Sequence, residues 1–460
     1  MSHTVFEDFI IDSEEKAFDL EHRRKINFNI GKYDISVPKG KTQFSNLELA
    51  RQRAAALKYR VTEKLDKYLT EFESNFTKRG GKVIWAEDGK EAIKEILEIA
   101  TQYKTKKVVK AKSMVTEEIH LNHAFEEKNI ISLETDLGEY IVQLAGETPY
   151  HIITPVMHKS KEDIAELFNE KKGLDINSTP EQIANYVRTI LRHEFTSAEM
   201  GVSGGNFLIA DTGSVALTEN EGNIVMSMSF PKVHIAIVGI EKMIPSLTDL
   251  DLFWPLLATH GTGQQLTAYN SIVSGPKQAE ETDGPEEMYV VLLDNGRSKL
   301  LAQTEQRRAL SCIRCGACLN GCPVYKNIGG HAYGTTYSGP IGAVITPHLR
   351  GMKQFKHLSY ASSLCGKCTE VCPVKIDLHK LLLLNRRDAV AQGFSPKTEK
   401  FSMFIFKKMM LSRTALDKAS PKIKNFGLKT FFRKAWGDRR EIPAITTKSF
   451  NQLWKEQRGI

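Results

Sequence analysis

Two short stretches, CIRCGACLNGCP at residues 312–323 and CGKCTEVCP at residues 365–373, hold all seven cysteines of the 460-residue chain. The first stretch has the spacing Cys-x2-Cys-x2-Cys-x3-Cys-Pro, which is the bacterial ferredoxin pattern. The second stretch has the same spacing without its first cysteine, and Ser362 stands at the position where that cysteine would be. Both stretches therefore predict iron–sulfur clusters.

The pattern also predicts which cysteines bind each cluster. Three thiolates of one loop hold three corners of a cubane cluster, and the cysteine before proline binds the other cluster. The predicted ligands of the first cluster are Cys312, Cys315, Cys318 and Cys372. The predicted ligands of the second cluster are Cys322, Cys365 and Cys368. The second cluster is then either a three-iron cluster, 3Fe-4S, or a four-iron cluster, 4Fe-4S, completed by Ser362 oxygen, water or substrate, and we favour the four-iron form.

Zinc and disulfides are the alternative uses of these cysteines. A closed structural zinc site needs four ligands, usually from two separated pairs, and runs of four and three cysteines do not match that arrangement. The odd number of cysteines argues against disulfides. Residues 1–12 are mixed acidic and apolar, so we expect no secretory signal and a reducing, cytoplasmic location.

The composition is that of an ordinary globular chain, with 41% hydrophobic and 26% charged residues, and its length suggests two or three domains. The net charge of +8 is uneven, because residues 397–440 hold 13 Lys or Arg and 3 Asp or Glu. We expect this basic tail to pack on its own protein, or to make a peripheral contact with a membrane or an acidic partner. It carries no nucleic-acid motif, so we expect no nucleic-acid partner.

Short apolar runs alternate with helical patterns between residues 82 and 239. Residues 82–86, 107–110 and 234–239 predict strands, as does the weaker run at His151–Ile153, whereas residues 88–102 and 180–195 predict helices. This alternation is typical of an α/β domain with a largely parallel sheet.

These patterns divide the chain into four expected parts. They are an N-terminal helical extension at 1–69, an α/β domain at 70–295, an α-helical dicluster domain at 296–395 and the basic tail at 396–460. Within the extension, residues 47–69 have the spacing of one helical stripe, and we expect an irregular segment around Val37–Gly40.

Two loops rich in small residues are candidates for a ligand pocket. The glycines at 201–205 fit neither a P-loop nor a dinucleotide-binding fingerprint, so they form either a tight turn or a backbone-lined pocket for an anionic group. Residues 259–265 are expected to form a second such loop. His260 in that loop is either a structural residue or a weak pocket candidate.

The segments ADTGS at 210–214 and TENEG at 218–222, within residues 109–276, resemble the LUD (lactate utilization) domain family. That domain is related to the ribose-5-phosphate isomerase and CoA-transferase folds. Together with the cysteine stretches and the basic tail, the whole chain resembles the LUD-domain iron–sulfur proteins. The resemblance implies an α/β LUD domain followed by an α-helical dicluster ferredoxin domain.

The resemblance also implies a function. Such a protein would be a subunit of a cytoplasmic complex that oxidises L-lactate to pyruvate, with a cysteine-rich iron–sulfur protein and a second LUD-domain protein as partners. In the CoA-transferase relatives, a glutamate in a Glu-Asn-Gly turn is the nucleophile. Here Glu221 separates Glu219 and Asn220 from the glycine, so Glu219 is a pocket candidate or a structural cap rather than a nucleophile.

We favour an electron-transfer subunit, because the sequence has two predicted clusters and no flavin or nicotinamide fingerprint. A second hypothesis is that the LUD pocket and the open corner of the second cluster together oxidise a 2-hydroxy acid. A third is a scaffold whose clusters sense iron or oxygen.

Overall fold

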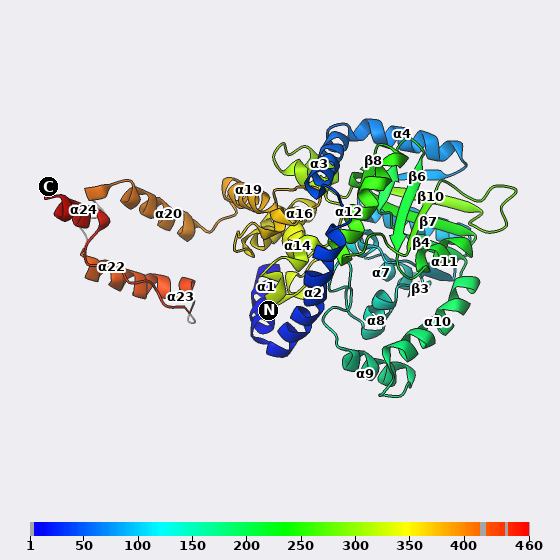
Figure 1. The fold of residues 1–460 in the computed structure, drawn as a ribbon, viewed down its shortest axis with the longest axis horizontal. Coiled ribbons are helices and arrows are strands. Elements are labelled where there is room, and N and C mark those ends of the chain that lie inside the picture. The colour runs from blue at the N-terminus through cyan, green and yellow to red at the C-terminus, as the bar shows by residue number, and fades with distance from the viewer. Residues whose placement is uncertain (1–3, 415–419, 438–439, 460) are drawn as a thin grey trace. The chain divides into compact units, whose positions relative to one another are not determined.

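The protein is seen in a computed structural model that describes residues 4–414, 420–437 and 440–459. The chain forms two compact units, Met1–Ala389 and Val390–Ile460 (Figure 1). Within the described ranges, no helix is both long enough and apolar enough to cross a lipid bilayer.

A six-stranded parallel sheet forms the centre of the first unit, with the strand order β1-β10-β7-β4-β2-β3 (Figure 1). Its strands are β1 (Lys82–Ala86), β2 (Lys107–Lys110), β3 (Ile131–Glu134), β4 (Met200–Ser203), β7 (Val233–Gly239) and β10 (Glu287–Leu293). Every residue of β7 is buried. Ile235 and Ile237 face one apolar core while Ala236 and Val238 face another, which explains the unbroken apolar run. The predicted α/β class with a parallel sheet is confirmed.

A second, four-stranded sheet packs against the first. Its order is β8-β5-β6-β9, and β6 is antiparallel to both of its neighbours. The strands are β5 (Phe207–Ile209), β6 (Ser214–Glu219), β8 (Met243–Ile244) and β9 (Tyr269–Val273). Leu208 and Val215 of this sheet share an apolar core with Val290 of the six-stranded sheet and with Phe72 and Phe76.

Helices surround the two sheets and begin at the capping residues that the sequence provides. Asn46 accepts the backbone N–H of Leu49, and Asp88 accepts those of Lys90 and Glu91. These elements are α3 (Leu47–Glu63), α4 (Leu65–Lys78), α5 (Gly89–Gln102), α6 (Met114–Glu118), α7 (Leu121–Glu126), α8 (Leu137–Ala145), α9 (Lys161–Lys172), α10 (Pro180–Ser197), α11 (Asn223–Ser229) and α12 (Leu250–Thr262), with 3-10 turns η1 (Ile240–Lys242) and η2 (Leu247–Asp249).

The N-terminal residues form α1 (Val5–Phe18) and α2 (Leu20–Lys41). The expected irregular segment at Val37–Gly40 is therefore wrong, since Pro38 lies inside α2. Tertiary contacts hold the end of this helix against α12. The Ser36 hydroxyl donates to the Thr262 carbonyl at 2.8 Å, and a Cβ on Gly40 would lie 2.3 Å from the Gly263 carbonyl oxygen. Packing here overrides the local preference of proline.

The region that holds the cysteines is helical, which confirms the predicted class of this domain. Its elements are α13 (Arg297–Leu301), η3 (Gln306–Ser311), α14 (Ala317–Asn320), α15 (Tyr325–Ile328), η4 (His331–Tyr333), α16 (Gly339–Leu349), α17 (Met352–Phe355), η5 (Lys356–Tyr360), α18 (Lys367–Glu370) and α19 (Leu378–Ala391). Each cysteine stretch combines a tight loop with one short helix, so that Cys318 lies in α14 and Cys368 lies in α18.

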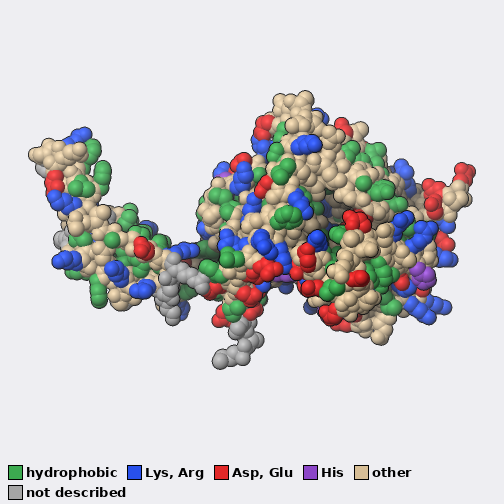
Figure 2. All heavy atoms as spheres, turned by 60° about the horizontal axis from the view of Figure 1, so that its bottom comes forward, with side chains coloured by type: hydrophobic (Ala, Val, Ile, Leu, Met, Phe, Trp, Pro, Cys, Tyr) green, Lys and Arg blue, Asp and Glu red, His purple; other side chains and the backbone are tan. Residues whose placement is uncertain are grey.

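The second unit contains α20 (Lys397–Met410), α22 (Pro421–Gly427), the π-helical turn η6 (Leu428–Phe432), α23 (Arg433–Trp436) and α24 (Phe450–Arg458). Large apolar side chains of this unit are exposed, among them Phe401, Phe404 and Phe450. Figure 2 shows hydrophobic side chains and Lys and Arg side chains interleaved on its surface.

Two further sequence predictions are wrong. His151–Ile153 is not a strand, because the His151 Nδ1 atom accepts the backbone N–H groups of Ile153 and Thr154 and bends the chain. The expected loop at 259–265 is helical as far as Thr262, where α12 ends at Gly263 with a φ of +83°.

Gly213 supports a direct test of the packing between the sheets and α4. A Cβ at this residue, which has a φ of +61°, would lie 2.2 Å from the Phe76 backbone nitrogen. Gly146 has a similar φ of +68° with nothing within 4 Å of its Cβ position, and serves as the control. Gly146→Ala should cost about 1 kcal/mol of backbone strain, and Gly213→Ala about 2 kcal/mol more from the clash. Equal shifts in the urea unfolding midpoint would contradict this packing.

Candidate functional site

The structure groups the seven cysteines around two small cavities. Cys312, Cys315, Cys318 and Cys372 line the first. Cys322, Cys365 and Cys368 line the second, together with Ser362. Each cavity thus combines cysteines of both stretches, as the spacing predicted, while the binding of clusters by these residues stays a prediction.

The two cysteine loops share one local conformation. Arg314 and Leu364 have φ values of 59° and 55°, and the next glycines, Gly316 and Gly366, have 74° and 80°. The Arg314 backbone N–H donates to Cys312 Sγ at 3.3 Å, and the Leu364 backbone N–H donates to Ser362 Oγ at 3.1 Å. Ser362 therefore occupies the place in the second loop that Cys312 has in the first.

The chemistry of the two cavities fits iron–sulfur clusters. Burial raises the pKa of Cys368 and of Cys372 to about 11, so these thiols stay protonated unless a metal displaces the proton. Backbone N–H groups of Tyr325 and Ile376 donate to Cys322 Sγ and Cys372 Sγ at 3.5 and 3.3 Å. Such donors stabilise the charge of cluster sulfur ligands.

Helix α3 contributes two cations near the first cavity that the sequence did not reveal. Arg51 donates to the Cys372 carbonyl at 2.9 Å and to the Glu370 carbonyl at 2.7 Å. Lys58 is buried and donates to the carbonyls of Glu241 and Met243 at 2.6 and 3.1 Å. Burial lowers the pKa of Lys58 to about 7. The N-terminal extension thus contacts the second cysteine stretch and the end of the sheet.

A buried charge network joins the LUD-like sheet to the first cysteine loop. Glu241, in the turn η1 that follows β7, accepts from Arg297 Nε at 2.6 Å and from Arg314 Nη2 at 3.2 Å. Glu118, at the end of α6, accepts from Arg297 at 2.8 Å and from the Tyr337 hydroxyl at 2.6 Å. Burial alone would raise the pKa of Glu241, but Arg297, Arg314 and Lys242 lower it to about 2. Both carboxylates are therefore ionised in the interior.

A cavity of about 320 Å³ lies beside this network. Lys112, Asp136 and Gly204 reach its wall just after the carboxyl ends of β2, β3 and β4, and Lys242 follows β7. Ligands of parallel sheets bind at such carboxyl ends. Arg314 lines both this cavity and the first cysteine cavity. One sequence feature could have indicated this site. The charged residues Glu241 and Lys242 follow a buried strand in the sequence.

The two weak pocket candidates, Glu219 and His260, lie in different parts of the structure. Glu219 lines the cavity, but its carboxylate accepts the backbone N–H groups of Ile224 and Val225 at 2.6 and 3.1 Å, which caps α11. His260 lies inside α12, outside the cavity wall, with Nδ1 at 2.9 Å from the Leu256 carbonyl oxygen. Burial lowers the pKa of His260 to about 4. Both side chains therefore fit the structural role that was the alternative to a pocket role for each residue.

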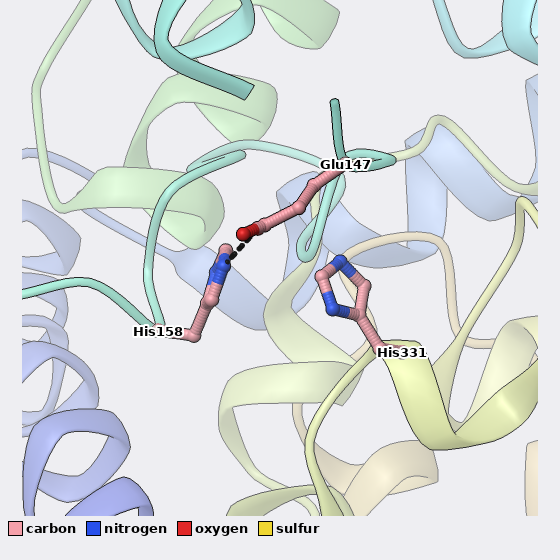
Figure 3. Close-up of side chains that lie close together, drawn as sticks. All are labelled: Glu147, His158 and His331. Carbon is pink, nitrogen blue, oxygen red and sulfur yellow. Dashed lines mark hydrogen bonds and ion pairs between the residues drawn. The ribbon is translucent and has the colours of Figure 1, made fainter. Parts of the chain in front are cut away.

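A third group of polar side chains lies where the loop after α8 meets η4. Figure 3 shows His158 directed at Glu147, with His331 beside them. His158 Nε2 lies 2.6 Å from Glu147 Oε2, and Lys159 pairs with the other oxygen at 2.6 Å. His331 Nε2 lies 2.7 Å from the Thr148 carbonyl oxygen. The Glu147 pairs lie within the loop after α8, and the hydrogen bond between His331 and Thr148 connects this loop to η4.

Arg297 should be essential for stability. Its side chain is 1% exposed and pairs with two buried carboxylates, so Arg297→Met leaves Glu118 and Glu241 uncompensated. We expect a loss of about 3–5 kcal/mol in the free energy of unfolding. Arg387→Met, which removes an ion pair with Glu305 between half-exposed side chains, is the control and should change stability little. Similar stabilities of the two variants in urea unfolding would show that the network contributes nothing.

Comparisons with known proteins agree with this architecture. The LUD domain family model matches residues 69–293, and the 4Fe-4S dicluster domain model matches residues 308–376. The second match makes this region an iron–sulfur cluster-binding domain. A solved structure of a DUF162 family protein from Deinococcus radiodurans covers 50% of this chain and 98% of its own, with 12% identity and a TM-score of 0.29, which is too low to support an inference.

Much closer sequence relatives cover nearly the whole chain. Proteins named lactate utilization protein B from Bacillus thuringiensis (strain Al Hakam), Bacillus cereus (strain AH187) and Bacillus anthracis (strain A0248) are each 46% identical to it over 432 residues, covering 91% of this chain and 91% of the relative. The similarity includes both the α/β sheet and the cysteine loops, and the chain belongs to the lactate utilization protein B family.

Proposed function

We propose that this protein is the iron–sulfur electron-transfer subunit of a complex that oxidises L-lactate to pyruvate, which allows lactate to serve as a carbon and energy source. The observation that carries the proposal is the pair of cysteine-lined cavities built from two interleaved stretches. The relatives are named lactate utilization protein B, which supports lactate as the substrate of the whole complex.

The stoichiometry of the reaction fits this role. Conversion of lactate to pyruvate releases two electrons and two protons, and iron–sulfur clusters supply one-electron transfer when bound. Cys318 and Cys322 are four residues apart in sequence and line different cavities, which keeps the two centres in one small domain. Arg314, beside the first cavity, provides positive charge that would stabilise an added electron.

We assign two clusters to the chain. Cys312, Cys315, Cys318 and Cys372 would hold the first, and Cys322, Cys365 and Cys368 three corners of the second. We propose that the second is a four-iron cluster whose remaining ligand is Ser362 Oγ, because Ser362 has the local geometry of Cys312. His379 also lines the second cavity, with Nδ1 at 2.8 Å from Thr369 Oγ1, and a three-iron cluster is the remaining alternative.

The proposed partners are a cysteine-rich iron–sulfur protein and a second LUD-domain protein, in the cytoplasm. The exposed phenylalanines of the basic second unit, such as Phe401 and Phe404, offer a surface for a partner or for peripheral contact with a membrane.

The hypothesis of catalysis at an open cluster corner receives less support. The 320 Å³ cavity and the cavity at Ser362 have no lining residue in common within the part of the chain that the structure describes. A substrate in the larger cavity would instead lie beside the first loop, where four cysteines are present. A scaffold that only senses iron or oxygen would need no such cavity beside a cysteine loop, so this hypothesis also receives less support.

Ser362 variants test the assignment of the second cluster. Ser362→Cys should change the electron paramagnetic resonance signal of the reduced second cluster and make it more resistant to loss of iron in air. Ser362→Ala should increase the signal of an oxidised three-iron cluster after brief exposure to air. His379→Ala is the matched control and should retain the wild-type signals. Wild-type spectra in both Ser362 variants would rule out this residue as a ligand.

The relay function is tested by adding L-lactate anaerobically to the cluster-loaded chain, alone and with its two partner proteins. Visible absorbance and electron paramagnetic resonance should show reduction of the clusters only when the partners are present. Reduction of the chain alone would favour catalysis within this subunit. Clusters that stay unchanged while the complete complex turns over would favour the sensing scaffold.

A further inference from the structure

The wall of the 320 Å³ cavity includes a buried cation that is not paired with a carboxylate. Lys242 lines it, is 7% exposed, and has no hydrogen bond or ion pair with any residue that the structure describes. Its neighbour Glu241 already uses one carboxylate oxygen for Arg297 and the other for Arg314. A buried cation without a partner is costly, so this arrangement indicates that an anion belongs in the cavity.

Arg314 also lines this cavity. Its Nη2 atom binds Glu241 at 3.2 Å, whereas Nε and Nη1 have no partner among the described residues. Its guanidinium stacks on the Tyr337 ring at 4.5 Å, which fixes its plane. A guanidinium beside an ammonium gives this part of the wall a positive charge that favours a carboxylate.

The other cations nearby are already engaged. Lys58 does not line the cavity and donates to two backbone carbonyls. Lys112 lines the cavity, but its ammonium donates to the Ile153 carbonyl. Lys242 is therefore the cation of this wall that makes no hydrogen bond or ion pair with any described residue.

The remaining wall suits a small organic molecule. Ile153 and Leu257 provide apolar surface, while Asn206, Thr218 and Thr267 provide amide and hydroxyl groups. Three carboxylates, those of Asp136, Glu219 and Glu221, also line the cavity. A volume of about 320 Å³ is at the lower end for small-molecule sites and is too small for a peptide or a nucleic acid.

We propose that this cavity binds a small organic carboxylate, with the carboxylate group against Lys242 and Arg314. The same cations then interact with two negative charges, the bound carboxylate and the first cluster, because Arg314 also lines the first cysteine cavity. A bound carboxylate offsets part of the positive charge that favours reduction of the first cluster. Binding therefore lowers the reduction potential of that cluster, and reduction weakens binding by the same factor. The identification of the carboxylate as L-lactate or pyruvate rests on the proposed function.

Binding is tested by isothermal titration calorimetry on the anaerobic, cluster-loaded full chain. The probes are L-lactate, pyruvate and lactamide, which has the shape of lactate without the charge. We expect lactamide to bind at least about 10-fold more weakly than lactate, and Lys242→Met to weaken lactate binding by about 10- to 100-fold, as expected for the loss of a charge-assisted hydrogen bond. Lys242→Met removes an unpartnered buried charge, so it should fold.

Arg387→Met is the control, because it removes a half-exposed cation that lies outside the cavity wall. It should retain lactate binding. In wild-type protein, saturating lactate or pyruvate should lower the midpoint potential of the first cluster in a redox titration, and this shift should vanish in Lys242→Met.

Two results would overturn the proposal. One is the absence of binding by either carboxylate. The other is equal binding by wild type and Lys242→Met, with only the cluster potential changed, which would mean that the cations balance the cluster alone. In both cases, reduction of the clusters by lactate with partners present would leave the relay function intact. Binding without any such reduction would support the cavity assignment and count against the proposed function.

Discussion

The ionised carboxylate of Glu241 between Arg297 and Arg314 is the interaction on which the first unit depends. Glu241 lies in η1, just after the central strand β7, Arg297 begins the helical region, and Arg314 lies inside the first cysteine loop. In the interior, such charges are stable only when each has its partner and its geometry is fixed. The network therefore fixes the cysteine loop relative to the carboxyl ends of the strands, and a cavity forms between them.

This arrangement gives the N-terminal extension a role beyond covering the sheet. Lys58 of α3 binds the carbonyls on both sides of Lys242, and Arg51 of the same helix binds the carbonyl of Cys372. One helix thus contacts the sheet and the second cysteine stretch. Because Met1–Ala389 forms one compact unit, the α/β and cysteine-containing regions share a continuous interior in which charge on one side affects the other.

The sequence predicted the features that depend on local pattern. The apolar runs located the strands β1, β2 and β7, and the cysteine spacing grouped the cysteines as the structure has them, although their ligation stays a prediction. It could not predict the partners of Glu118, Glu241 and Arg297, because a charged residue in sequence resembles any surface residue until the fold removes it from water. It also placed Pro38 in an irregular segment, since the contact between Gly40 and Gly263 exists only in the tertiary structure.

The central claim is that the interleaved cysteine loops hold two iron–sulfur clusters. It is tested most directly by measuring iron and acid-labile sulfide per chain in anaerobically purified protein, with electron paramagnetic resonance before and after reduction by dithionite. The account predicts about eight irons per chain, four for each cluster, and interacting signals from two reduced clusters. About four irons with a single reduced signal, or zinc in place of iron, would contradict it.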